Sequence, residues 1–252
     1  IDTVMLSLMK GDIVVGWYSA AYRMVYVLLF IPAAYFASLY PVISQFYKSS
    51  QESLKFAYER STRYMLAIGL PLGVGTSLLA DRIILLIYGV EYAPAIAALQ
   101  ILIWAIFFSY LSHAPMYTLN SINRQRIYTY PVSFSMVLNI ILNLVLIPRF
   151  SYIGASIATV ATEFLAFAFL FGYLLRLFKN ALPFTFLIKV FISALVMAVF
   201  VIFCGKLMNL GWLVFIAATI YFTLILLFRA FSKEEILLLK RLISLRRDKS
   251  RG

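Results

Sequence analysis

Three ionisable residues lie deep inside apolar stretches of the sequence, where a charge is costly and usually has a function. Asp2 stands 11 residues before Ile13 and Arg23 stands 10 residues after it, so both would reach similar depths on two antiparallel helices. We hypothesise that Asp2 and Arg23 pair, or that both line one polar cavity. A purely structural ion pair explains the same spacing. The third residue, Glu163, lies on a later stretch.

Glu163 is the one charge in the apolar run 150–175 and lies near its middle. It would serve as a proton or ion relay, or it would pack helices as a buried, protonated acid. Tyr18, Tyr22 and Tyr26 recur every four residues and therefore share one helix face. That face would either pack against a neighbouring helix or form a wall that stacks on sugars and donates hydroxyl groups.

Other residue types set limits on the chemistry. The chain has a single cysteine, Cys204, and a single histidine, His113, which excludes an internal disulfide, a cysteine-based metal cluster and a zinc site with two histidines. The sequence lacks the GxxxxGK[ST] loop that cradles nucleotide phosphates. We expect no metal, no cofactor and no catalytic residue, so the protein would not be an enzyme. Asn139 and Asn143 share a helix face, where buried amides bind helices together.

The elements that position these residues follow from the composition. Of the 252 residues, 63% are hydrophobic and 13% are charged, against roughly 45–50% and 25% in soluble domains. The mean hydropathy is +0.94. A soluble fold of this length cannot bury so much apolar surface, because a folded monomer still exposes a large area to water. The sequence therefore predicts an all-α integral membrane protein with a multi-helix transmembrane bundle.

Apolar runs locate the helices that would cross the membrane. A first run, 1–9, is too short for a bilayer, which takes about 20 residues. It would be a partial helix of a longer chain. Later runs with few or no charges have the required length: 24–47, 64–80, 92–123, 127–148, 150–175, 180–205 and 207–228.

The polar links between these runs also have predicted structures. The link at 48–63 is expected to form a short amphipathic helix, and the segment 81–93 to lie at the membrane interface. We divide the chain into a transmembrane bundle, 1–228, and a basic tail, 229–252.

The positive charges alternate between the two sides of the predicted bundle. Of the 22 Lys and Arg residues, sixteen fall in links on one side and in the tail, and four fall in links on the other side. Arg23 and Lys189 lie within helices, and Lys189 is close enough to a helix end to reach the surface. Such a bias predicts a cytoplasmic C-terminus in the cell membrane. It explains the net charge of +12 without nucleic acid, and the tail would fix topology or bind anionic lipid.

Four segments together resemble one transporter family. Their order and spacing resemble the second half of polysaccharide and oligosaccharide flippases (Wzx-like) of the multidrug/oligosaccharidyl-lipid/polysaccharide exporter superfamily. The segments are DTVMLSLMKGDIVVGWYSAAYR at 2–23, PAAYFASLYPVIS at 32–44, LIYGVEYAPAIAALQIL at 86–102 and NIILNLVLIPRFSYIGASIAT at 139–159.

The resemblance implies a second lobe of a two-lobed exporter, made of the partial first helix and about six full spans, which works by alternating access. It implies a polyprenyl-pyrophosphate-linked oligosaccharide as substrate, with the bilayer and an N-terminal lobe as further partners. Arg23 is the position to which the family's pyrophosphate-binding cation carries over. Asp2, Tyr18, Tyr22, Tyr26 and Glu163 are the other candidates for the substrate cavity.

Alternatives remain within and outside this class. A lipid II flippase or a cation-coupled drug exporter of the same superfamily would share the fold, and a drug exporter should have acids lining this lobe. An integral-membrane glycosyltransferase or ligase would need large outer loops that carry acids or histidines, whereas the outer links here are short.

Overall fold

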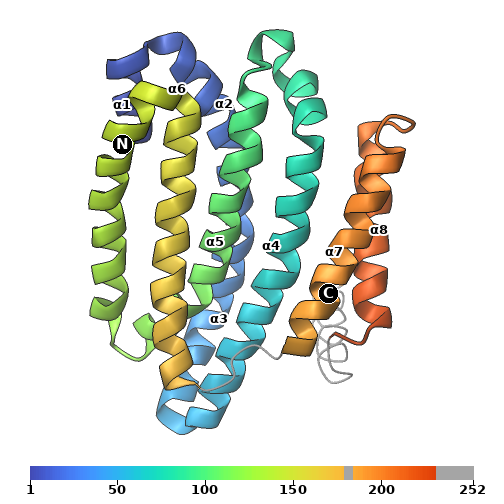
Figure 1. Cartoon of the computed structure of the whole chain (residues 1–252). Helices are drawn as coiled ribbons and strands as arrows, with labels where there is room; N and C mark the ends of the chain where they lie inside the picture. The colour runs from blue at the N-terminus through green and yellow to red at the C-terminus, as the bar shows by residue number, and fades with distance from the viewer. Residues whose placement is uncertain (179–183, 231–252) are drawn as a thin grey trace, which may run out of the picture. The chain divides into compact units, whose positions relative to one another are not determined.

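The computed structural model describes residues 1–178 and 184–230, and every regular element within them is helical. The described chain divides into two compact units, of which the first ends at Pro183 and the second begins at Phe184. Figure 1 shows the helices of the first unit, which are α1 (Asp2–Lys10), α2 (Asp12–Tyr26), η1 (Val27–Leu29), α3 (Phe30–Ser49), α4 (Gln51–Tyr88), η2 (Val90–Tyr92), α5 (Ala95–Ser121) and α6 (Gln125–Leu177). The second unit contains α7 (Phe184–Cys204) and α8 (Leu210–Leu227).

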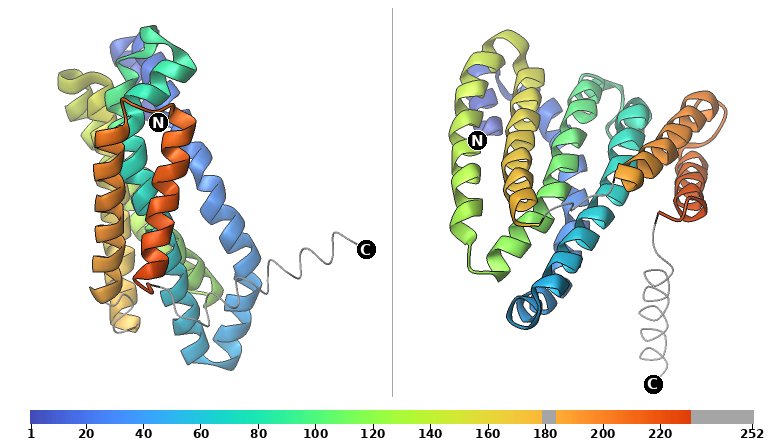
Figure 2. Two further views of the ribbon diagram at one scale, coloured as in Figure 1. Left: turned by 90° about the vertical axis from the view of Figure 1, so that its right-hand side faces the viewer. Right: turned by 60° about the horizontal axis from the view of Figure 1, so that its bottom comes forward.

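The membrane-length helices agree with the apolar runs. Six helical segments are long and apolar enough to cross a membrane, with α2, η1 and α3 forming one of them. The 53-residue helix α6 is broken at Ser151, whose φ of 54° and ψ of −135° are not helical. Figures 1 and 2 show its two arms, 125–150 and 152–177, side by side and antiparallel. Each arm has the length of a separate span.

The two ends of the first unit separate the basic residues as the charge alternation predicts. At one end, the Lys10 ammonium donates to the backbone carbonyl of Pro148 at 3.0 Å, which joins the α1–α2 turn to the apex of α6. At the other end, Arg124 donates to the Tyr173 hydroxyl at 3.0 Å across the two arms. Links that are neighbours in the predicted topology therefore meet in space.

Helix α5 forms the core of the first unit. It packs against α4 on one side and α6 on another, and it also contacts α2 and α3. Glycines permit the close approach of α4: a β-carbon at Gly69 would lie 3.3 Å from the Phe107 ring, and one at Gly73 would lie 3.5 Å from Trp104. The Gly-rich segment GLPLGVG is thus used for helix packing, as expected inside an apolar span.

Helix α4 is longer than the sequence indicates. It runs from Gln51 to Tyr88 without interruption, since Ser50 caps its first turn by accepting from the backbone N–H of Ser53 at 3.2 Å. The expected amphipathic helix at 48–63 is therefore the first part of a long helix. Most of the segment 81–93 is its last part and does not form a separate interfacial element.

A 3-10 turn, η1, interrupts the first long span between α2 and α3. In an α-helix the carbonyl of Leu28 would accept from the residue four positions later, but Pro32 has no N–H. The hydroxyl of Tyr110 on α5 donates to that carbonyl at 2.6 Å instead. A side chain from the core helix thus satisfies the backbone where the span bends.

We expect Tyr110→Phe to lower the free energy of unfolding by about 1–3 kcal/mol, because the Leu28 carbonyl would lose its donor in an apolar environment. Thermal unfolding in detergent micelles measures the loss. Tyr117→Phe is the control, since no hydrogen bond of the Tyr117 hydroxyl is found within the described residues. Equal melting temperatures for the two variants would contradict this role of Tyr110.

The second unit is a helical hairpin in which α7 packs against α8. Lys189 on α7 donates to the backbone carbonyl of Arg229, just after α8, at 3.3 Å. This contact agrees with the prediction that Lys189 reaches a helix end. The tail from residue 231 onward lies outside the described residues.

Candidate functional site

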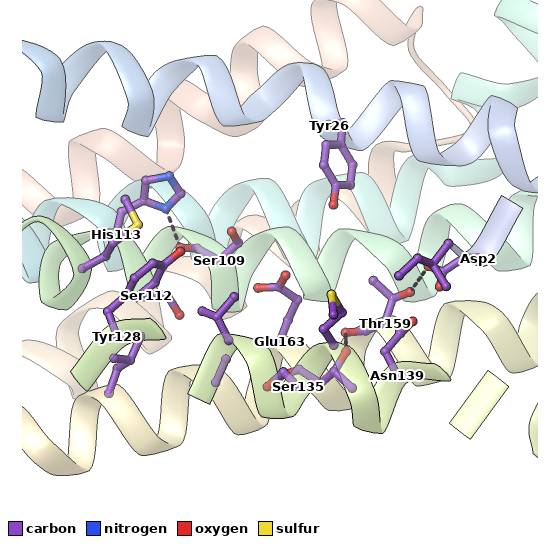
Figure 3. Close-up of a pocket in the computed structure, with 17 residues that line it drawn as sticks. Asp2, Tyr26, Ser109, Ser112, His113, Tyr128, Ser135, Asn139, Thr159 and Glu163 are labelled. Carbon is purple, nitrogen blue, oxygen red and sulfur yellow. Dashed lines mark hydrogen bonds between the residues drawn. The ribbon is translucent and has the colours of Figure 1, made fainter. Parts of the chain in front are cut away.

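A cavity of about 340 Å³ lies inside the first unit, and we call it the polar cavity because many of its lining side chains are polar. Helices α1, α2, α5 and both arms of α6 line it (Figure 3). Its wall carries hydroxyl, amide, imidazole and carboxyl groups among apolar side chains. The polar lining residues are Asp2, Tyr26, Ser109, Ser112, His113, Tyr128, Ser135, Asn139, Thr159, Thr162 and Glu163.

Asp2 is the centre of a hydrogen-bonded group at one end of this cavity. Its Oδ2 atom accepts from the Tyr18 hydroxyl at 2.8 Å and from the Thr159 hydroxyl at 2.8 Å, and its Oδ1 atom accepts from the Asn143 amide at 2.7 Å. The Asn143 amide also donates to Asn139 Oδ1 at 3.0 Å. We call Asp2, Tyr18, Asn139, Asn143 and Thr159 the Asp2 cluster. It joins α1, α2 and the two arms of α6.

The fold brings these side chains together through the turn at Ser151. That turn places the two arms of α6 side by side, so Asn143 on one arm and Thr159 on the other reach the same carboxylate. Tyr18 and Asn143 are fully buried. A carboxylate with three donors is well satisfied, because hydrogen bonds to a charged group are stronger than those between neutral groups.

One atom of the cluster lacks a partner in the described part of the chain. The amide oxygen Oδ1 of Asn143 is buried and accepts no hydrogen bond there. Buried polar groups are almost always satisfied by protein, water or an ion. Carboxylate, amide and hydroxyl oxygens are ligands that hard cations prefer. The cluster therefore offers oxygen ligands to a small hard cation.

The lining chemistry disfavours an anion in this cavity. Two carboxyl groups, Asp2 and Glu163, line it, and no Lys or Arg side chain does. In residues 1–178 and 184–230, no three His, Cys, Asp or Glu side chains come together as a possible metal site. The cavity thus suits a proton or a cation held by oxygen atoms, and its electrostatics oppose a pyrophosphate.

Two of the three tyrosines predicted to share one helix face belong to this site. Tyr18 is buried in the Asp2 cluster, and Tyr26 lines the polar cavity. Tyr22 lies between them, with ring centroids 5.8 Å from Tyr18 and 3.9 Å from Tyr26. The tyrosines form a stacked row along the cavity. Since Tyr18 is buried and bonded to Asp2, its hydroxyl is a structural donor and is not free to meet a sugar.

Arg23 does not join this site. It is exposed, it does not line the polar cavity, and it forms no ion pair with Asp2 in the described residues. In the described residues the two side chains do not pair, and the polar cavity includes Asp2 but not Arg23. Arg23 follows Tyr18 by five residues, which turns it about 140° around the helix from the side chain that bonds to Asp2.

Glu163 and His113 both line the polar cavity. In Figure 3 the Glu163 carboxyl group lies between the Asp2 cluster and His113. The His113 ring nitrogen Nδ1 bonds with the backbone carbonyl of Ser109 at 2.7 Å. The sequence uses His113 only to exclude a zinc site with two histidines, and it gives no sign that His113 lines this cavity.

Sequence reasoning also missed Thr159, Thr162 and Ser135. A hydroxyl residue within an apolar helix usually bonds to its own backbone, as Thr159 and Thr162 also do. Such residues carry no signal in the sequence. The position of Thr159 two helical turns after the Ser151 break is the one feature that places it near Asn143.

Comparisons with known proteins agree with this architecture. Residues 1–145 match the MatE family. The chain is 27% identical over 234 residues to the uncharacterised membrane protein MJ1068 of Methanocaldococcus jannaschii, covering 90% of this chain and 45% of that protein. It is 24% identical over 159 residues to the probable low-salt glycan biosynthesis flippase Agl15 of Haloferax volcanii, covering 63% of this chain and 34% of that protein.

A solved structure shares the fold. The chain superimposes on the lipid II flippase MurJ in an inward closed conformation with a TM-score of 0.69 at 17% identity, covering 94% of this chain and 52% of MurJ. The chain thus spans between 34% and 52% of the length of these three proteins.

Proposed function

Because the chain belongs to the MatE family, a family of multi-pass membrane proteins, we propose that it is one lobe of a flippase. The substrate we propose is an oligosaccharide on a polyprenyl pyrophosphate, moved across the cell membrane for polysaccharide biosynthesis. A relative named as a probable glycan biosynthesis flippase and the fold shared with a lipid II flippase support this class. A first lobe would supply the remainder of the transport path.

The Asp2 cluster is the observation that carries the proposal. A carboxylate inside a membrane costs free energy, so one that joins three helices there usually has a function. Asp2 would take up a proton or a cation, and loss of the carboxylate charge would loosen its hold on Tyr18, Asn143 and Thr159. Because those contacts link α1, α2 and both arms of α6, their strength would bias the lobe between two arrangements.

Arg23 would act on the substrate from a different face. Its side chain is exposed on α2, outside the acid-lined polar cavity. An exposed guanidinium on a membrane helix can bind a pyrophosphate bidentately. We propose that the glycan-lipid headgroup meets this outer face of α2 and that the ion meets the inner face.

A transport assay tests the proposal. Vesicles containing the chain and its first lobe are loaded with a fluorescent lipid-linked oligosaccharide, and a quencher outside reports the arrival of label. Arg23→Ala is expected to slow flipping at least tenfold, whereas Arg126→Ala, at an exposed position in the first turn of α6, should leave it unchanged. Equal flipping by wild type and Arg23→Ala would contradict the role of Arg23. An absence of flipping by wild type would contradict the proposed function.

A cation-coupled drug exporter is the second candidate. The observation that favours it is the polar cavity itself, which two acids line without a basic residue. Such a cavity attracts organic cations. The same vesicles, loaded with a cationic dye, separate the two functions: dye export without sugar flipping would favour the exporter.

Orientation belongs to the same proposal. The end of the first unit with Lys48, Arg124, Arg126 and Arg176 would face the cytoplasm, because positive residues accumulate there. The bundle 1–228 would then carry the tail 229–252 on the cytoplasmic side. No nucleic acid is proposed as a partner, and no bond would be made or broken in the substrate.

A further inference from the structure

A second cavity, of about 260 Å³, lies at the opposite end of the first unit from the Lys10–Pro148 contact, and we call it the basal cavity. The ends of α3, α4, α5 and α6 converge there. Its lining residues are Tyr47, Gln51, Leu54, Ile122, Arg124, Leu177 and Phe178. None of them lines the polar cavity, so the two sites are separate.

The basal cavity is amphipathic. Its floor is apolar and buried, with Leu54 and Phe178 each 3% exposed and Ile122 6% exposed. Its rim is polar, with the Tyr47 hydroxyl, the Gln51 amide and the Arg124 guanidinium. A ligand that fits this cavity therefore carries an apolar part and a polar part.

Arg124 is exposed at this rim and makes one side-chain hydrogen bond. One of its N–H groups donates to the Tyr173 hydroxyl at 3.0 Å, and a guanidinium has five N–H donors in a rigid plane. The remaining donors suit the oxygen atoms of a phosphate, which arginine binds bidentately. Three further cations, Lys48, Arg126 and Arg176, are exposed at this end of the bundle, whereas the Lys55 ammonium is paired with Glu59 at 3.8 Å.

We propose that the basal cavity binds an anionic phospholipid of the surrounding leaflet, with the headgroup phosphate on Arg124 and the start of an acyl chain over Leu54. The volume fits a headgroup and not a whole lipid, since pockets for drug-sized ligands measure roughly 300–1,000 Å³. A free phosphate would leave the apolar floor unused. Basic pockets between membrane helices at the cytoplasmic side commonly take such headgroups.

Native mass spectrometry of the detergent-purified chain tests the proposal. The protein is mixed with phosphatidylglycerol or with phosphatidylcholine, and the retained lipid is counted. Wild type is expected to retain phosphatidylglycerol preferentially, and Arg124→Gln to weaken that retention at least threefold. Arg126→Gln is the matched control, because it removes an equal charge two residues away that does not line the cavity. Equal losses in the two variants would show a diffuse charge effect and overturn the site.

Two further measurements separate folding and ligand source. Arg124→Lys keeps the charge at the rim but not the planar pair of donors, so a folded Arg124→Lys protein should retain phosphatidylglycerol more weakly than wild type and more strongly than Arg124→Gln. Retention no better than that of Arg124→Gln, at an unchanged melting temperature, would overturn the proposal. Millimolar inorganic phosphate should not displace the lipid, because it cannot fill the floor. Full displacement would identify a free phosphate as the ligand and contradict the lipid. None of these outcomes depends on flipping, so failure here leaves the proposed function untouched.

Discussion

Replacing Asp2 by Ala is expected to reduce transport at least tenfold and to lower the melting temperature of the chain. The carboxylate accepts from Tyr18, Thr159 and Asn143 at 2.7–2.8 Å. Its removal would leave the buried Tyr18 hydroxyl without its acceptor, which costs roughly 1–3 kcal/mol. Asn143 and Thr159 would keep only their contacts within α6, to Asn139 and to the Ala155 carbonyl. The contacts between α1, α2 and both arms of α6 would weaken together. Flipping in vesicles and thermal unfolding in detergent measure the two effects.

Asp2→Asn separates the charge from the packing. The amide keeps the shape of the carboxyl group, but its NH₂ group faces a donor in at least one of the three contacts, so a part of the destabilisation should remain. If the charge couples transport to an ion, flipping should fall as far as in Asp2→Ala. If Asp2→Asn flips the substrate at the wild-type rate, Asp2 does not couple transport to an ion.

Asp12→Ala is the matched control for both variants. Asp12 opens α2, is exposed and accepts from the Ser7 hydroxyl at 3.2 Å. It lies outside the Asp2 cluster and the polar cavity. Its loss should change stability by less than 1 kcal/mol, since exposed substitutions away from special features have small effects. A transport defect as large as that of Asp2→Ala would mean that any acid in this region matters.

Gly154→Ala is expected to destabilise the first unit by about 3 kcal/mol, at the upper end of the range for overpacking. Gly154 follows the break of α6 at Ser151 by three residues. A β-carbon there would fall within 3.0 Å of the backbone carbonyl of Leu146 on the other arm. Backbone atoms cannot move aside as a flexible side chain can, so the arms would have to separate. Thermal unfolding in detergent micelles gives the size of the loss.

Gly172→Ala, on the same arm, provides the comparison. No atom lies within 4 Å of the β-carbon it would add. Alanine has a higher helix propensity than glycine, so this variant should be more stable by roughly 0.5–1 kcal/mol. Opposite signs for Gly154→Ala and Gly172→Ala are the expected result. If both variants gained stability, the close approach at Gly154 would not exist in the protein.

Much of the bundle could be predicted because a membrane leaves few choices. An apolar run of about 20 residues must satisfy its own backbone, so it becomes a helix. The positive residues at Lys10, Arg124 and Arg176 mark alternate links, and the contacts Lys10–Pro148 and Arg124–Tyr173 place those links at two opposite ends. The long helix α4 was the exception, because polar residues at 48–63 look like a link although α4 continues through most of them.

The sequence predicted how deep in the membrane the site residues lie, but not which of them contact one another. Asp2 was identified as an acid deep in an apolar stretch, and Asn143 as an amide that binds helices, and the two are bonded at 2.7 Å. The partner of Asp2 was not predictable, because depth along a helix says nothing about direction around it. Tyr18 and Arg23 differ by five residues, and that angle decides which of them faces α6. Thr159 had no signal, because a threonine in an apolar run commonly bonds to its own helix.

The break at Ser151 has a consequence for how this chain enters a bilayer during synthesis. Two arms of 26 residues each are joined through a single non-helical residue, so no flexible loop separates them. Neither arm can adopt an orientation of its own, because a connection of one residue cannot cross the membrane between them. The pair must therefore partition from the translocation machinery as one hairpin. The basic residues Arg124 and Arg176 would determine the orientation of the hairpin, and therefore of both spans.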